Sequence, residues 1–558
     1  MSVLSPLFYE RCARASRPIL KPCHSRRLTR RREMLLLTFL ALISSALGDA
    51  ITLQTEHGPV KGRVAVKDGV KPYVAFVGIP YALPPIGQLR FKDPVPLQDG
   101  KNVLNNTLSH PACLQQRPIV ENNNMMLTSV KGEEDCLYVS VYAPVTVFSL
   151  KDKLFPVMVF IHGGGYMFGY PEDSPSRFTD EDVIVVYVTY RLGPLGFMAT
   201  GDGVIPSNVG LKDQALALRW VRRYIKSFNG DPDQVTLVGQ SAGAACVHYH
   251  MMSPSSNGTF QRAILQSGSL FAPWAATTMD EMKEKTFFLA SKLGCQGDSN
   301  EILSCMQNLG ADVVVTAQTV FNFWDVDPVT IFVPVLTGET LVESKMPILT
   351  GVNSLEGGLK AFLLKNASSE KIEDFLDNKE DFLRRMMFLG EDDESVKTAR
   401  VVVTKYLKDV TTKRQLIKSL VNFYSEVYFL APELVTTMYH KGKIYTYVYD
   451  YRGRSCDLRD IQLDGLCGLH SEELSMLFRK DDGPMEEPED EFYARQLARL
   501  WVDFVKNGDP TPGDESKWNP LGEKFEYLTM TKGGFSMREH FLKKVWGLTN
   551  FLYKFNRN

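Results

Sequence analysis

The chain lacks the features that mark several large classes of protein. Its 558 residues carry a net charge of only −2, and they contain neither an internal repeat nor a spacer rich in proline, glycine and serine. Repeat arrays and strings of linked domains are therefore excluded. Beyond residue 48, no apolar stretch reaches the roughly 20 residues needed to span a bilayer. With 44% hydrophobic residues, the chain can bury a large core, which favours one large domain.

The N-terminus differs from the rest of the chain. Residues 34–48 form an uncharged apolar run that ends in small residues, which is typical of a secretory signal peptide cleaved after Gly48. Residues 1–33 hold nine Lys or Arg and two Glu, a charge of +7, so residues 49–558 carry −9. We interpret 1–33 as a basic extension that is disordered or not translated, in preference to a nucleic-acid-binding arm or a membrane anchor. We expect a secreted protein with no stable membrane anchor, and its acidic remainder gives no reason to expect nucleic-acid binding.

The most informative stretch is Gly239-Gln240-Ser241-Ala242-Gly243, which lies between an apolar, strand-like run and a helix-like segment. This is the context of a nucleophile elbow, in which flanking glycines permit a turn tight enough to project the serine Oγ. The same pattern also recurs in ordinary turns. Its context makes Ser241 the candidate nucleophile.

A glycine-rich loop upstream contains groups that could stabilise a reacting oxygen. His162-Gly163-Gly164-Gly165 follows an apolar run, and its missing side chains let backbone N–H groups approach a substrate. We expect the N–H groups of Gly164, Gly165 and Ala242 to form an oxyanion hole.

An acid and a histidine follow the serine in the chain. Glu356 ends a strand-like segment, and His470 lies in a later loop. The order Ser, Glu, His is that of an α/β-hydrolase rather than of chymotrypsin or subtilisin. We expect His470 to take the proton of Ser241, Glu356 to orient the imidazole, and an acyl-enzyme to form. Glu472 and Glu473 are weaker candidates for the acid, because they neighbour the histidine in its own loop.

Apolar runs alternate with helical patterns along the chain, which predicts an α/β-hydrolase fold: a large, mostly parallel central sheet with helices on both faces. The predicted strands are Phe155 to Ile161, Val183 to Tyr190, Gln234 to Val238, Arg262 to Gln266, Met346 to Gly351 and Lys443 to Tyr449. Helices are predicted over Leu211 to Phe228 and along an apolar stripe that ends near Asn507. Because the catalytic candidates follow strands, we expect them to meet at the carboxyl edge of the sheet.

Several motifs occur together with the elbow. They are Glu133-Glu134-Asp135-Cys136-Leu137-Tyr138-Val139, the segment Thr189 to Phe197, and the segment Asn208 to Gln214. With them, residues 51–545 resemble the type-B carboxylesterases, the family of cholinesterases and insect carboxylesterases. Arg90-Phe91, Asp213-Gln214, Gln240 and Gly468-x-x-His470-x-x-Glu473 are similar to the motif set of insect juvenile hormone esterases.

The resemblance implies several structural roles. It pairs Cys113 with Cys136 and Cys295 with Cys305, it makes Ser267 a support for Glu356 and His470, and it makes Arg90 with Glu134 and Arg191 with Asp213 structural ion pairs. The spacing of Cys456 and Cys467 predicts a third disulfide, with reduced thiols as the alternative for all three pairs. Cys246 is expected to be a small core residue. Sequons at Asn105, Asn257 and Asn366 are candidate glycosylation sites on a secreted chain.

Departures from the family pattern bear on the substrate. The span Leu114 to Asp135 has no tryptophan to hold a quaternary ammonium, so choline esters are disfavoured. Gln240 replaces a commoner glutamate, and Thr337 stands where the family usually has aspartate. We expect a small-molecule ester with a neutral, apolar acyl group, and neither cofactor nor metal, because no acid or cysteine cluster completes His248-x-His250 as a metal site.

Three hypotheses about function follow. The first is a secreted serine carboxylesterase, with juvenile hormone methyl ester as a candidate substrate. The second is a general detoxifying or odorant-degrading esterase. The third, from another class, is a non-catalytic adhesion or binding protein on the same fold, which the complete set of catalytic candidates disfavours.

Overall fold

The computed structural model describes residues 50–554, apart from short gaps. The gaps are residues 57, 67–69, 99–110, 122–123, 128, 151–152, 172, 325–329, 337–342, 359–360, 362–363, 365–366, 454–467, 481–484, 486 and 512–517. Several predictions therefore lie outside the described residues: the basic extension, the signal peptide, the Cys456 and Cys467 pair, the sequons at Asn105 and Asn366, and Thr337.

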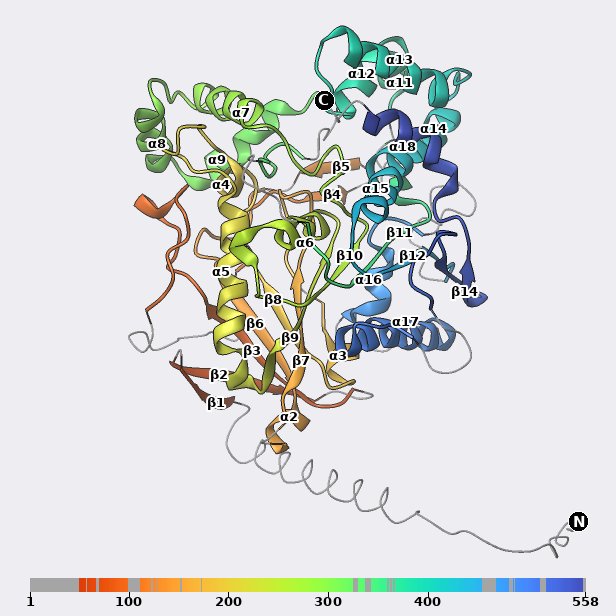
Figure 1. Cartoon of the computed structure of the whole chain (residues 1–558). Helices are drawn as coiled ribbons and strands as arrows, with labels where there is room; N and C mark the ends of the chain where they lie inside the picture. Colours follow the sequence, from red (N-terminus) through yellow and green to blue (C-terminus); the bar gives the residue numbers. More distant parts are fainter. Residues whose placement is uncertain are drawn as a thin grey trace, which may run out of the picture. The chain divides into compact units, whose positions relative to one another are not determined.

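A twelve-stranded sheet organises the described part of the chain (Figure 1). Its strands, in spatial order, are β1 (Ala50–Thr55), β2 (Gly58–Ala65), β3 (Tyr73–Pro80), β6 (Tyr138–Pro144), β8 (Ile184–Val188), β7 (Phe155–Ile161), β9 (Gly230–Gln240), β10 (Arg262–Gln266), β11 (Ile348–Asn353), β12 (Ile444–Asp450), β13 (Tyr527–Thr531) and β14 (Gly534–Arg538). Strands β8 through β13 run parallel, while the pairs β2–β3, β3–β6, β6–β8 and β13–β14 are antiparallel. A separate hairpin joins β4 (Pro118–Glu121) to β5 (Asn124–Leu127).

The central strands form where the sequence predicts them. β7 and β10 have the predicted bounds, and β8, β11 and β12 differ by a few residues at their ends. β9 begins at Gly230, four residues earlier than predicted. Their side chains are almost all buried, as expected for parallel strands covered on both faces. The α/β-hydrolase fold is confirmed.

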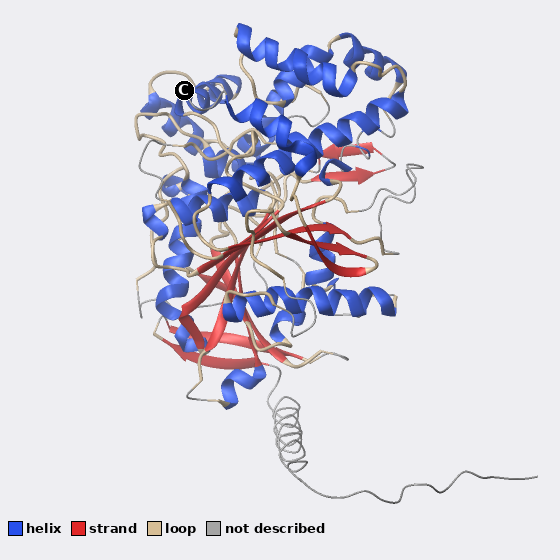
Figure 2. Cartoon of the chain, turned by 45° about the vertical axis from the view of Figure 1, so that its right-hand side comes forward, coloured by secondary structure: helices blue, strands red, loops and turns tan. Residues whose placement is uncertain are grey.

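Helices lie on both sides of the twisted strands (Figure 2). The principal ones are α5 (Val209–Tyr224), α6 (Ala242–Met252), α7 (Met279–Lys292), α8 (Ser299–Asn308), α9 (Ala311–Ala317), α16 (Glu472–Leu477), α17 (Pro488–Asn507) and α18 (Trp546–Lys554). The predicted helix 211–228 consists of α5 and the 3-10 turn η2 (Ile225–Phe228), after which Asn229 adopts φ 60°. α17 ends at Asn507 as predicted, and Gly508 follows it in the left-handed conformation.

A helical block between β11 and β12 was not predicted. It contains α11 (Ser369–Asp377), α12 (Lys379–Met386), α13 (Asp393–Leu407), α14 (Lys413–Phe423), the π-helical turn η6 (Tyr424–Leu430) and α15 (Ala431–Tyr439). Figure 1 draws these helices in teal and blue beside α18. They share an apolar core of their own, which reaches the sheet at Val352 of β11. A second core, centred on Tyr447, Trp501 and Trp518, lies between the sheet and α17.

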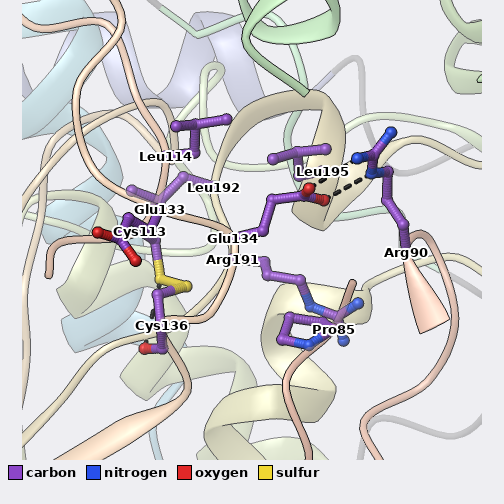
Figure 3. A pocket seen from close by; sticks show the side chains of 10 residues that line it. All are labelled: Pro85, Arg90, Cys113, Leu114, Glu133, Glu134, Cys136, Arg191, Leu192 and Leu195. Atoms are coloured by element: carbon purple, nitrogen blue, oxygen red, sulfur yellow. Dashed lines mark hydrogen bonds and ion pairs between the residues drawn. A yellow bond between two sulfur atoms is a disulfide. The ribbon is translucent and has the colours of Figure 1, made fainter. Parts of the chain in front are cut away.

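Covalent and ionic links stabilise the segments before β7 and the segments after it. Disulfides join Cys113 to Cys136 and Cys295 to Cys305, as the family resemblance implied. Both expected ion pairs are present: the guanidinium of Arg90 makes two hydrogen bonds to Glu134, and that of Arg191 makes two to Asp213. A cavity beside the first disulfide is lined by charged groups from both ion pairs (Figure 3). No catalytic candidate lines it, so we regard it as part of the scaffold.

Within the described residues, no helix combines the length and apolar character that crossing a membrane would require.

Candidate active site

Ser241 lies on a strained turn between β9 and α6. Its backbone has φ 57° and ψ −126°, a conformation that L-residues rarely adopt. A Cβ at Gly239 would lie 2.3 Å from the carbonyl oxygen of Gly243, and a Cβ at Gly243 would lie 2.2 Å from that of Ile161. Both flanking residues must be glycine because the backbones approach this closely. The predicted elbow geometry is present.

The glycine-rich loop after β7 lies directly against the elbow. A Cβ at Gly163 would lie 2.9 Å from the Cβ of Ser241 and 2.5 Å from the carbonyl oxygen of Gln240. Gly164 and Gly165 both have positive φ, 105° and 61°. Strand order reverses at β7, with β8 on one side and β9 on the other, and ligands bind at the carboxyl edge beside such a reversal. The loop and the elbow follow β7 and β9 at that place.

His162, which opens the loop, has a structural role. Its Nδ1 lies 2.9 Å from the carbonyl oxygen of Gly163, and its ring stacks on Tyr190 with centroids 4.5 Å apart. Burial lowers the pKa of His162 to about 4, so the ring is neutral and fixed.

His470 and Glu356 meet, although 114 positions separate them. The Nδ1 of His470 lies 2.6 Å from the Oε2 of Glu356, whose side chain is completely buried. Since an ionised carboxylate can only accept, Nδ1 is the donor of this hydrogen bond, and a ring that carries a single proton has its lone pair on Nε2. This is the tautomer that a general base requires.

The side chain of Gln240 lies next to Nε2, the other ring nitrogen of His470. Its Nε2 lies 3.3 Å from the Nε2 of His470, where the amide can donate to the lone pair. Among the described residues, Ser241 Oγ has no hydrogen-bond partner. In the sequence, Gln240 stood out only as the replacement of a commoner glutamate and as one member of a motif set. The structure makes it a direct neighbour of the predicted base, at the position that the serine hydroxyl must reach.

Aromatic side chains border the histidine. The ring of Phe429, from η6, packs against His470 with centroids 4.6 Å apart, and Trp274 packs against Phe429 at 5.8 Å. Tyr166 lies beside Trp274 at 6.5 Å. These contacts give the site an apolar wall.

The two glutamates next to His470 have different roles. Glu472 accepts the backbone N–H groups of Gly468 and Leu469 and thereby closes the histidine loop on itself. Glu473 is fully buried, and its carboxylate accepts from Gln266 and Asn353. The acid that hydrogen-bonds to the ring of His470 is Glu356. Burial, followed by the negative charge of Glu356, raises the pKa of Glu473 to about 7.

Ser267 follows β10 with φ 53°, and its N–H donates to the carbonyl oxygen of Gly351. Its Oγ is buried and has no hydrogen-bond partner among the described residues. The supporting role that the family resemblance implied for it stays a prediction.

Glu433 is a buried acid that the sequence did not single out. It lies on α15, is 1% exposed, and accepts one hydrogen bond, from Thr350 Oγ1 at 2.7 Å. Burial raises its pKa to about 8, and the charge of Glu356 acts in the same direction. The carboxyl group therefore keeps its proton at neutral pH. The signal available in the sequence was an acid within an otherwise apolar helix face.

The remaining candidates behave as core residues. His250 contacts Ser256 and Gln214, His248 contacts Ser269, and Cys246 is a buried free thiol. Among the described residues, no group of three or more His, Cys, Asp or Glu could hold a metal ion. Asn257 is exposed and can accept a glycan, but its modification stays a prediction.

The Gly163→Ala variant tests the contact between loop and elbow. The added methyl group would collide with the backbone of Gln240 and the Cβ of Ser241. We expect kcat to fall about 10²-fold, because the oxyanion donors shift, and stability to fall by about 1–3 kcal/mol. Gly547→Ala on α18 is the matched control: its Cβ meets nothing within 4 Å, so kcat should not change. Equal kcat in the two variants would contradict the assigned contact.

The pH dependence of stability tests the protonation of Glu433. An unfolded glutamate ionises near pH 4.3, whereas the folded chain holds this proton up to about pH 8. Stability attributable to Glu433 is therefore present in full below about pH 4 and is lost as the pH rises towards 8. We expect Glu433→Gln, which keeps an acceptor for Thr350, to match the wild type near pH 5 and to melt at a higher temperature near pH 9. A melting-temperature difference that is constant over this range would refute the assignment.

The chain is similar to known proteins along most of its length. Residues 49–546 match the Carboxylesterase family. Venom carboxylesterase-6 of Apis mellifera is 31% identical over 508 residues, which cover 85% of this chain and 89% of the relative. Juvenile hormone esterase of Tribolium castaneum is 32% identical over 510 residues, which cover 84% and 85%. The crystal structure of juvenile hormone esterase from Manduca sexta, with OTFP covalently attached, has the same fold: it superposes with a TM-score of 0.77 at 24% identity, over 90% of this chain and all of that one. The chain therefore belongs to the carboxylesterase family and is a carboxylic ester hydrolase.

Proposed function

We propose that the chain is a secreted serine carboxylesterase that hydrolyses neutral, hydrophobic carboxylic esters through an acyl-enzyme on Ser241. The observation that carries this proposal is the hydrogen bond from His470 to the buried Glu356, together with the strained elbow on which Ser241 lies. Residues 49–558 are proposed to form the catalytic domain.

The proposed reaction follows from the tautomer of His470. As the substrate carbonyl is attacked, Nε2 accepts the proton of Ser241, and Glu356 stabilises the imidazolium. The N–H groups of Gly164, Gly165 and Ala242 bind the oxyanion. The imidazolium then protonates the leaving alcohol, and water hydrolyses the acyl-enzyme by the reverse sequence. The amide of Gln240 has to leave Nε2 before the serine hydroxyl can donate to it.

The apolar wall supports an apolar substrate. Phe429 offers aromatic surface next to the base, which favours a hydrophobic group on the ester. The buried Trp274 packs against Phe429, and the buried Tyr166 packs against Trp274. Juvenile hormone methyl ester is one candidate of this kind. The similarity to a venom carboxylesterase is as high as that to a juvenile hormone esterase, so a general detoxifying or odorant-degrading esterase is the alternative.

Secretion has separate support. The apolar run 34–48 has the pattern of a signal peptide, and the two disulfides are of the kind that forms in an oxidising compartment.

The Ser241→Ala variant tests the nucleophile. We expect the wild type to hydrolyse p-nitrophenyl or naphthyl esters and to be labelled at Ser241 by an organophosphate. The variant should fold normally, escape labelling and lose activity by about 10⁴-fold or more. A variant that keeps wild-type activity would disprove the proposed nucleophile. A folded wild type without activity would support the adhesion or binding hypothesis.

A substrate comparison tests the specificity. If the natural substrate is juvenile hormone, kcat/KM for its methyl ester should exceed that for short aryl esters by about 10²-fold or more, because apolar contacts along the chain stabilise the transition state. Similar values for both substrates would instead support a general esterase.

A further inference from the structure

Asn353, the last residue of β11, joins the two loops that carry the predicted acid and base. It is fully buried, and its backbone N–H donates to Glu356 Oε1 at 2.7 Å. Its side-chain amide donates to the carbonyl oxygen of Leu469 and, at 2.6 Å, to Glu473 Oε2. Leu469 immediately precedes His470. One residue therefore holds the acid by its backbone and the histidine loop by its side chain.

The same network reaches the backbone of the nucleophile. Glu473 Oε1 accepts a hydrogen bond from Gln266 Nε2 at 3.1 Å, and the carbonyl oxygen of Gln266 accepts the N–H of Ser241 at 2.8 Å. A continuous path of hydrogen bonds thus runs from Ser241 through Gln266 and Glu473 to Asn353. From there it divides to Glu356 and to the residue before His470.

Other contacts hold the two loops together without this side chain. The N–H of Leu355 donates to the carbonyl oxygen of Gly468 at 2.8 Å, and Glu472 accepts the N–H groups of Gly468 and Leu469. Removing the amide of Asn353 should therefore leave the loops folded. What would change is the position of the histidine ring relative to Glu356 and Ser241.

The charges around Asn353 favour a neutral side chain at this position. The titratable groups that face it and its partners are Glu356, Glu472, Glu473 and His470, with Glu433 on α15 and Tyr447 on β12 close to them. All of these except His470 are acids. An amide can donate to a carboxylate here without adding a further negative charge, which buried surroundings would make costly.

We propose that Asn353 is a positioning residue of the esterase, whose amide sets the placement of the His470 loop against Glu356 and ties both to the backbone beneath Ser241. The proposal rests on the triad proposed above.

The Asn353→Ala variant removes both side-chain donors and keeps the backbone N–H that holds Glu356. We expect kcat to fall about 10- to 10²-fold while KM changes less than about 3-fold, since misplacing the base affects the chemical step more than binding. Titration with an organophosphate should be used to measure the concentration of folded active sites, so that kcat is compared per active site. If the variant keeps the wild-type kcat and only its melting temperature falls, Asn353 is merely structural and the proposal is wrong.

A double variant that exchanges the two partners and conserves their total charge provides the matched control for a single variant that does not. Asn353→Asp alone places a carboxylate against Glu473, so kcat should fall and the acid limb of kcat/KM should move to higher pH, because the added charge favours the imidazolium. In the double variant Asn353→Asp with Glu473→Gln, the hydrogen bond re-forms with donor and acceptor exchanged, and the total charge returns to its original value. We expect the acid limb of kcat/KM to return to its wild-type pH. We expect kcat to recover only in part, because the bond to Leu469 is still missing.

Two outcomes separate failure of this proposal from failure of the triad. If the single and double variants are equally impaired and share one pH profile, the bond between residues 353 and 473 has no positioning role. If Ser241→Ala retains full activity in the same assay, the triad itself is wrong, whatever the variants at residue 353 do.

Discussion

Parallel pairing of the strands from β7 to β12 is the constraint on which the site depends. Adjacent parallel strands end at the same edge of a sheet, about 4.8 Å apart, so groups that follow them become neighbours regardless of their separation in sequence. The register pairs Gln266 with Gln240 on one side and with Gly351 on the other. The elbow, the serine after β10 and the loop that carries Glu356 therefore emerge side by side. His470 joins them after β12, where Leu355 and Leu469 form an isolated bridge.

The close approach of backbones at this edge explains the glycines. Gly239, Gly243 and Gly163 each lie where a Cβ would come within 3 Å of another segment. The elbow can present Ser241 only because these positions lack side chains, and the same closeness lets backbone N–H groups face one reaction centre. The close backbone contacts make this edge rigid. The aromatic pair beside it comes from two places, Phe429 from η6 and Trp274 from the segment between β10 and α7.

Beneath this edge, three glutamates lie in a buried environment. Glu356 has His470 as its partner, whereas Glu433 and Glu473 have only neutral donors, and burial raises the pKa of each. Removal from water disfavours the charged form of any carboxyl group that lacks a cation. The amide groups of Asn353 and Gln266 donate to Glu473 and add no further charge to this buried environment.

The sequence by itself indicated the α/β-hydrolase class, the central strands and the chain order of the candidate nucleophile, acid and base. These follow from local hydrophobic pattern, from glycine at tight turns and from motif spacing, all of which can be read along the chain. The two disulfides and the two ion pairs were implied by the resemblance to a known family. Only the tertiary structure decided the contact of Gln240 with His470, the network through Asn353, the protonated Glu433 and the helical block that places Phe429. Each of these depends on which segments distant in sequence lie against one another and on how far the intervening space excludes water, and neither is encoded in a local pattern.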